Sequence, residues 1–141
     1  MNIREVQVGD LETVKVMIEE LEELKFDSLV FEKYFISNLN DPNVHYYIVE
    51  NQNQSLGFLG MRVFYPLHHC EPLLEITELI VMPGFRNQKI GELLIKFAVG
   101  FSKTHNCSQI ELSSNLKRTK AHAFYIRNGF TKGHFKFSKR L

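Results

Sequence analysis

Polar and apolar positions alternate along the chain with two different periods, which predict where strands and helices lie. A period of two is typical of a half-buried strand, as in 134–139, where two Phe residues alternate with His, Lys and Ser. Apolar residues at every third or fourth position predict an amphipathic helix after Asp10. We expect Asp10 and Thr119 to cap helices, and Asn128-Gly129 to end the last one. The expected strands are 3–8, 44–49, 56–65, 73–82, 109–113 and 134–139, and the expected helices are 11–21, 29–39, 89–105 and one starting at Thr119.

The order of these elements, β-α-α-β-β-β-α-β-α-β, predicts a mixed α+β fold in which helices flank a mixed sheet. A chain of 141 residues with 44% hydrophobic residues is long enough to bury a substantial core. No repeat, low-complexity tract or Pro/Gly-rich linker divides it. We therefore expect one domain over 1–141.

Charge and cysteine content limit the binding partners and the cellular compartment that we expect. The formal net charge of +1 gives no overall positive field, which argues against nucleic-acid binding and leaves anion recognition to local sites. No apolar run reaches the roughly 20 residues that span a bilayer, so no membrane partner is expected. Cys70 and Cys107 lie far apart, which favours two buried thiols in a reducing compartment over a single disulfide. The expected location is the cytoplasm.

The helix expected over 89–105 has positive side chains at its start, where positive charge is unfavourable. Arg86 and Lys89 lie at an N-terminus, whose free N–H groups already carry partial positive charge. A bound anion such as a phosphate would account for them, and Gly91 would allow it to approach the backbone. The alternative is a solvated basic loop that happens to precede a helix.

Two motifs carry a family resemblance. The stretch LIVMPGFRNQKIGELL, residues 79–94, resembles the acetyl-CoA pyrophosphate loop of the GNAT superfamily of N-acetyltransferases, although Lys89 stands where the first Gly is usual. AHAFYIRNGF, residues 121–130, resembles the second motif of that superfamily. The resemblance implies a mostly antiparallel sheet, acetyl-CoA as co-substrate and a homodimer. It assigns coenzyme contacts to Leu79, Ile80, Val81, Arg86, Asn87, Gln88, Lys89, Ile90, Gly91 and Glu92.

Acetyl transfer to an amine needs a base for the amine and an acid for the departing thiolate. Glu78 is the candidate base, directly or through water, because it alternates with the apolar residues Ile76, Ile80 and Met82 on a strand and desolvation raises a carboxyl pKa. One alternative is a structural carboxylate in an ion pair. Another, implied by the resemblance, is a strand bulge that shifts the face on which Glu78 lies. Spacing alone favours a core role for Tyr125, whereas the resemblance implies that it is the general acid.

Further segments resemble one narrower group, the aminoalkylphosphonate N-acetyltransferases. That resemblance implies a small primary amine carrying a phosphonate, for which Arg62, His68 and His69 are the candidate ligands. Lys117 and Arg118 are alternatives, though a solvated turn is expected for them. The group is also associated with a divalent metal, which His68 and His69 would bind, but the sequence offers no third ligand. The rival hypotheses are acetylation of polyamines or of protein N-termini, and a non-catalytic acyl-CoA-binding module. The segments that carry this resemblance are 23–27, 38–43, 67–70, 75–83, 112–118 and 134–141.

Overall fold

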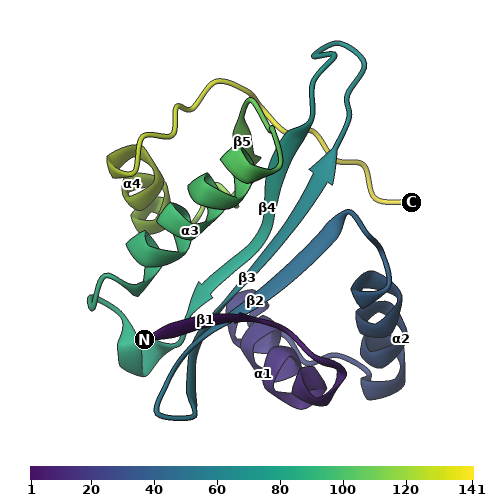
Figure 1. The fold of residues 1–141 in the computed structure, drawn as a ribbon, viewed down its shortest axis with the longest axis vertical. Helices are drawn as coiled ribbons and strands as arrows, with labels where there is room; N and C mark the ends of the chain where they lie inside the picture. Colours follow the sequence, from purple (N-terminus) through teal and green to yellow (C-terminus); the bar gives the residue numbers. More distant parts are fainter.

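A five-stranded sheet forms the centre of the computed structural model, which describes residues 1–141 (Figure 1). The strands lie in the order β1-β2-β3-β4-β5; the first four are antiparallel, and β5 runs parallel to β4. This arrangement confirms the predicted mixed, mostly antiparallel sheet flanked by helices. The elements are β1 Asn2–Glu5, a 3-10 turn Val8–Asp10, α1 Leu11–Glu22, α2 Ser28–Leu39, β2 Val44–Asn51, β3 Gln54–Phe64, β4 Leu73–Val81, a 3-10 turn Pro83–Phe85, α3 Ile90–Thr104, β5 Ile110–Leu112 and α4 Thr119–Arg127.

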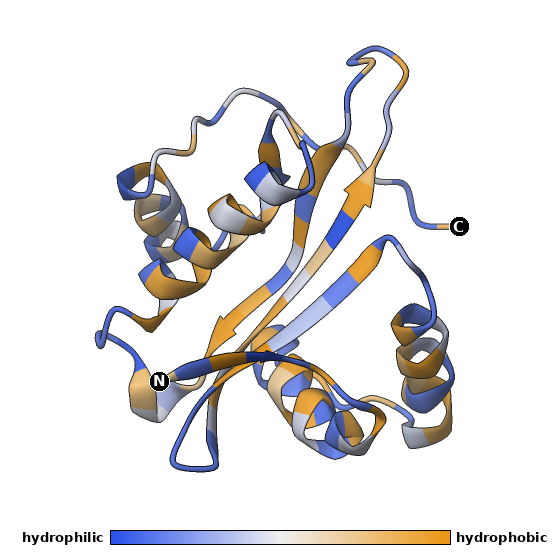
Figure 2. Ribbon diagram, viewed as in Figure 1, coloured by the Kyte–Doolittle hydropathy of each residue, from blue (hydrophilic) through white to orange (hydrophobic).

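Helices cover both faces of the sheet, and an apolar cluster fills each layer. On one face, Val14 and Met17 of α1 and Phe35 of α2 pack against strand residues such as Phe58. On the other face the apolar stripe of α3 packs on the sheet, and α4 lies beside α3 (Figures 1 and 2). The buried part of the α3 stripe consists of Ile90, Leu94, Ile95 and Ala98.

A β-bulge in β4 changes which side chains share a face. Gly60 on β3 pairs with Glu78, but the next residue, Met61, pairs with Ile76, so Thr77 is the extra residue. Ile76 therefore joins the core under α3, whereas Ile80 lies under α1 and α2. The prediction that Ile76 shares a face with Glu78 is wrong. The predicted grouping of Glu78 with Ile80 and Met82 is confirmed, because all three lie on the α1–α2 side.

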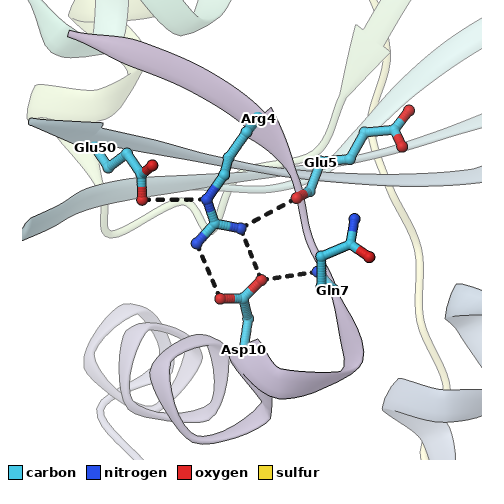
Figure 3. A network of polar contacts seen from close by, with 5 residues as sticks. All are labelled: Arg4, Glu5, Gln7, Asp10 and Glu50. Carbon is cyan, nitrogen blue, oxygen red and sulfur yellow. Dashed lines mark hydrogen bonds and ion pairs between the residues drawn. The ribbon is translucent and has the colours of Figure 1, made fainter. Parts of the chain in front are cut away.

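The carboxylate of Asp10 is used for an ion-pair network and does not cap α1. It accepts two hydrogen bonds from the Arg4 guanidinium, at 2.8 and 3.0 Å, and one from the Gln7 N–H at 2.7 Å (Figure 3). Arg4 also contacts Glu50 on β2 at 3.1 Å. The guanidinium holds the pKa of Asp10 below its usual range. The network therefore ties β1 and β2 to the start of α1.

The strand expected over 134–139 is absent. Phe130 follows the predicted helix end at Asn128-Gly129, but 131–141 form no ladder and run away from α4 to the opposite side of the molecule (Figure 1). Period-two alternation needs a neighbouring strand to become a sheet, and β5 presents only three residues. Phe135 and Phe137 are consequently 81% and 92% exposed.

Three further expectations concern thiols, membranes and assembly. Both cysteines are free, but Cys70 is exposed and Cys107 only partly buried, so the prediction of two buried thiols is wrong. No helix has the length and apolar character needed to cross a bilayer. The homodimer and the cellular location stay predictions.

Candidate active site

Glu78 lines a cavity of about 120 Å³ between the sheet and helices α1 and α2. Its position follows from the bulge at Thr77, which turns the Glu78 side chain to this face. Gly60 lies opposite on β3, where a side chain would collide with the Glu78 carboxylate. The cavity is mostly apolar, and the residues that line it are Val14, Ile18, Phe31, Tyr34, Phe35, Asn38, Tyr46, Phe58 and Glu78.

The surroundings of Glu78 suit a base. Burial is the main cause that raises the pKa of this carboxyl, and the negative charges of Glu22 and Glu75 raise it further. A hydrogen bond from the Thr77 hydroxyl acts in the opposite direction. No cation forms an ion pair with Glu78, since the six ion pairs of the structure involve other carboxylates. This is the environment of a proton acceptor rather than of a structural ion pair.

Two polar residues of this cavity were not predicted from the sequence. The Tyr46 hydroxyl accepts a hydrogen bond from the Asn38 amide at 2.7 Å. Burial, with the nearby charge of Glu78, raises the pKa of Tyr46 to about 12. Tyr46 and Asn38 thus supply the polar groups beside the carboxylate. The sequence signal for Tyr46 was its alternation with Ile48, which places both on the α1–α2 side.

The edge of β4 beside Glu78 is open. Pairing between β4 and β5 ends at Ile76 and Leu112, so the rest of β4 has no neighbour on that side. The Met82 N–H donates to Leu56 of β3, and alternate peptide groups of a strand point to opposite edges. Leu79 and Val81 therefore turn their peptide groups to the open edge, whereas Ile80 faces β3.

The loop that precedes α3 has an unusual backbone path. Asn87 and Lys89 have φ of 64° and 62°, a left-handed conformation that favours glycine. Lys89 thus keeps the backbone path that the usual glycine would allow, at a strain of about 1 kcal/mol or more. In the first turn, the N–H groups of Ile90, Gly91 and Glu92 donate to no protein acceptor.

Side chains of the loop are arranged around this turn. Arg86, Asn87, Gln88 and Lys89 are exposed, while Ile90 is buried and anchors the helix start. The Arg86 Nε donates to the Val81 carbonyl at 3.2 Å, and its Nη2 lies 3.9 Å from the Glu20 carboxylate of α1. A side chain at Gly91 would lie 3.0 Å from the Phe124 ring. Gly91 therefore makes room for α4, a reason different from the expected approach of phosphate.

Tyr125 lies on α4, on the α3 side of the sheet. Its ring contacts Phe124 and Phe130 edge-on, at centroid distances of 5.4 and 5.7 Å. Its hydroxyl makes no hydrogen bond to the protein and is not fully buried. Burial raises the pKa of Tyr125, and the nearby Arg118 partly offsets this. The phenol therefore keeps its proton at neutral pH and has it free to donate.

The predicted substrate ligands are not gathered around Glu78. Arg62 lies two residues along β3 from Gly60, about 7 Å away, and its Nε contacts Glu75 at 2.8 Å. His68 and His69 are exposed beyond the end of β3, with ring centroids 4.5 Å apart. No group of three or more His, Cys, Asp or Glu side chains is placed to hold a metal ion. The structure gives no support for a metal at the two histidines. The nearby hollow of about 180 Å³ is lined by Tyr65, Pro66, Leu67, Cys70, Glu71 and Pro72, away from Glu78.

Comparison with known proteins identifies the family. A family model described as "Acetyltransferase (GNAT) family" matches residues 12–130. The chain belongs to the GNAT family of acetyltransferases. This confirms the resemblance seen in the two motifs, and it makes the chain an acetyl-CoA-dependent N-acetyltransferase.

One curated relative agrees with this assignment, and solved structures share the fold. The aminoalkylphosphonate N-acetyltransferase of Salmonella typhimurium is 37% identical over 139 residues, which cover 99% of this chain and 90% of that protein. A transcriptional regulator from Bacillus halodurans has a similar fold, with a TM-score of 0.91, 22% identity and 99% of each chain covered. An aminoglycoside N-acetyltransferase in complex with CoA has a TM-score of 0.87 at 15% identity, with 99% of this chain and 93% of that chain covered. The last two likenesses bear on the fold alone.

Arg86 provides a direct test of the coenzyme loop in this GNAT enzyme. We expect Arg86→Ala to weaken acetyl-CoA binding about tenfold at low salt, and by less as salt screens the charge. Isothermal titration at two salt concentrations measures both effects. Arg127→Ala, which removes an exposed cation from the last turn of α4, is the matched control and should change neither. Unchanged affinity in Arg86→Ala would remove this side chain from the coenzyme site.

Proposed function

We propose that the enzyme acetylates the primary amine of a small aminoalkylphosphonate. The observation that carries this proposal is the 37% identity to the Salmonella typhimurium aminoalkylphosphonate N-acetyltransferase across 99% of the chain. A cavity of about 120 Å³ beside Glu78 has room for a small amine.

In the proposed reaction the amine attacks the acetyl carbonyl directly, without an acyl-enzyme intermediate. Glu78 takes the amine proton, directly or through a water, because its raised pKa makes it a better base than an exposed carboxylate. As the tetrahedral intermediate collapses, the C–S bond breaks and the thiolate of CoA takes a proton from the Tyr125 hydroxyl. Acetyl-CoA and the neutral amine give N-acetylamine and the CoA thiol; Glu78 then releases the amine proton to solvent and Tyr125 takes one up from solvent, which restores both side chains.

For the coenzyme, we propose that the open edge of β4 and the loop before α3 hold its two ends. The peptide groups of Leu79 and Val81 would bind the pantetheine arm, as a further strand would bind them. The diphosphate would lie against the first-turn N–H groups of α3, with Arg86 and Lys89 adding formal charge. Glu78 and Tyr125, on opposite sides of the open β4 edge, would then meet at the thioester.

A thiol-release assay with acetyl-CoA tests the acceptor. We expect aminomethyl- and aminoethylphosphonate to give higher kcat/KM than spermidine, a peptide N-terminus or propylamine. Preference for spermidine or for the peptide would overturn the phosphonate acceptor while leaving the acetyltransferase intact. Acetyl-CoA binding without release of CoA for any amine would instead favour the non-catalytic module.

A further inference from the structure

Arg118 is a partly buried cation that lacks a carboxylate partner. Of the arginines, only Arg4 and Arg118 are not exposed. Arg4 contacts the carboxylates of Asp10 and Glu50 (Figure 3). Arg118 contacts none, and its Nη2 donates to the Leu21 carbonyl at 2.6 Å. Its positive charge is therefore held in place by a neutral group and is not neutralised.

The contact with Leu21 joins Arg118 to the end of α1. Leu21 lies in the last turn of α1, next to Glu22, whose charge acts on Glu78. Arg118 is the residue before α4, and its charge acts on Tyr125, which lies on that helix. The guanidinium thus bridges the end of α1 and the start of α4, the elements on either side of the catalytic pair.

We propose that Arg118 is the cation that binds the acidic group of the acceptor. This inference rests on the proposed function and replaces Arg62 as the anion ligand. A guanidinium has five N–H donors, and the Leu21 carbonyl occupies one, so a bidentate contact to a phosphonate stays available. The contact to Leu21 also fixes the orientation of the planar group before the ligand arrives. The N-terminus of α4, which begins after Arg118, adds partial positive charge at the same place.

Arg62 is less suited to this task. Its Nε is paired with Glu75 at 2.8 Å, and its side chain is 49% exposed. Its guanidinium also lies over the Phe64 ring, 4.9 Å from the centroid. An incoming phosphonate would have to compete with the Glu75 carboxylate and with water. Arg118 has no carboxylate partner and is less exposed to water than Arg62, so a phosphonate would face less competition there.

The test compares acceptors with and without an acidic group at saturating acetyl-CoA. We expect Arg118→Gln to raise the KM for aminoethylphosphonate about 10- to 100-fold and to leave that for propylamine nearly unchanged. Arg62→Gln is the matched control and should affect neither acceptor selectively. Arg118→Lys keeps the positive charge but cannot make a bidentate contact, so its KM for aminoethylphosphonate should lie between those of wild type and Arg118→Gln. Thermal unfolding of Arg118→Gln shows whether the loss of the Leu21 contact disturbs the fold.

A second measurement does not depend on which amine is acetylated. Ethylphosphonate lacks the amine, and its binding to acetyl-CoA-loaded protein can be followed by NMR titration. Weaker binding in Arg118→Gln than in Arg62→Gln would support the anion site even if aminoalkylphosphonates proved not to be the preferred acceptors. Equal binding by wild type and Arg118→Gln would overturn it, as would equal rises in KM for both amines or a rise only in the KM for acetyl-CoA.

Discussion

Tyr125→Phe is expected to lower kcat about 100-fold while leaving the affinity for acetyl-CoA nearly unchanged. The substitution removes one oxygen from a ring that keeps its contacts with Phe124 and Phe130. The Tyr125 hydroxyl makes no hydrogen bond to the protein, so its removal leaves no buried partner unsatisfied. Stability should therefore hold while proton donation to the thiolate is lost. Steady-state kinetics and isothermal titration with acetyl-CoA measure the two quantities separately.

Tyr47→Phe is the matched control for this substitution. Tyr47 is also partly buried on the α3 side, with its ring 4.6 Å from Phe97, and its hydroxyl makes only a long contact of 3.5 Å with Glu5. Its loss should leave kcat at the wild-type level. Equal activity in Tyr125→Phe and wild type would take Tyr125 out of the mechanism and leave thiolate protonation to water. A fall in acetyl-CoA affinity with unchanged kcat would make it a binding residue.

The loop before α3 was singled out from the sequence because its signals are local, and its binding of the coenzyme stays a prediction. Misplaced cations before a helix, and a family motif over consecutive residues, depend on short-range geometry that the chain itself encodes. The structure supplies a physical reason for the departure at Lys89, which adopts the left-handed conformation that a glycine would otherwise favour. Helix and strand positions followed from periodicity for the same reason, with shifts of a few residues at their ends.

Features that depend on distant contacts were not readable. The bulge at Thr77 reassigns Ile76 to the opposite face, and nothing in a period-two pattern marks an extra residue. The alternation in 134–139 is a sound strand pattern, but the structure offers it no partner. Arg118 looked like part of a solvated turn because its acceptor, Leu21, lies 97 residues away. Ranking Arg118 above Arg62 required knowing that Arg62 already has a carboxylate partner and that Arg118 has none.

Glu78→Gln is expected to lower kcat about 100- to 1,000-fold, with little effect on acetyl-CoA binding. The amide keeps the size of the side chain and can still accept from the Thr77 hydroxyl, but it cannot take a proton. Glu75→Gln is the matched control, since Glu75 lies on the same strand and pairs with Arg62. It should keep most of the activity. Comparable losses in the two variants would mean that the carboxylates act through the local charge rather than through proton transfer at Glu78.

The pH dependence of these variants separates a base from a structural carboxylate. The folded pKa of Glu78 is raised above its ordinary value of 4.5, and a base acts in its deprotonated form. The wild-type kcat/KM should therefore fall as the pH drops through a pKa above 4.5, and Glu78→Gln should lack this acid limb. Glu75→Gln should move the limb to lower pH, since the charge of Glu75 contributes to the raised pKa.

A raised carboxyl pKa stabilises the fold fully below pH 4.5, and this contribution is lost as pH rises through the folded pKa. Glu78→Gln should accordingly be more stable than wild type at neutral pH, with the advantage vanishing in acid. Lower activity together with higher stability is the combination that a residue kept for chemistry predicts, and lower stability at neutral pH would make Glu78 structural.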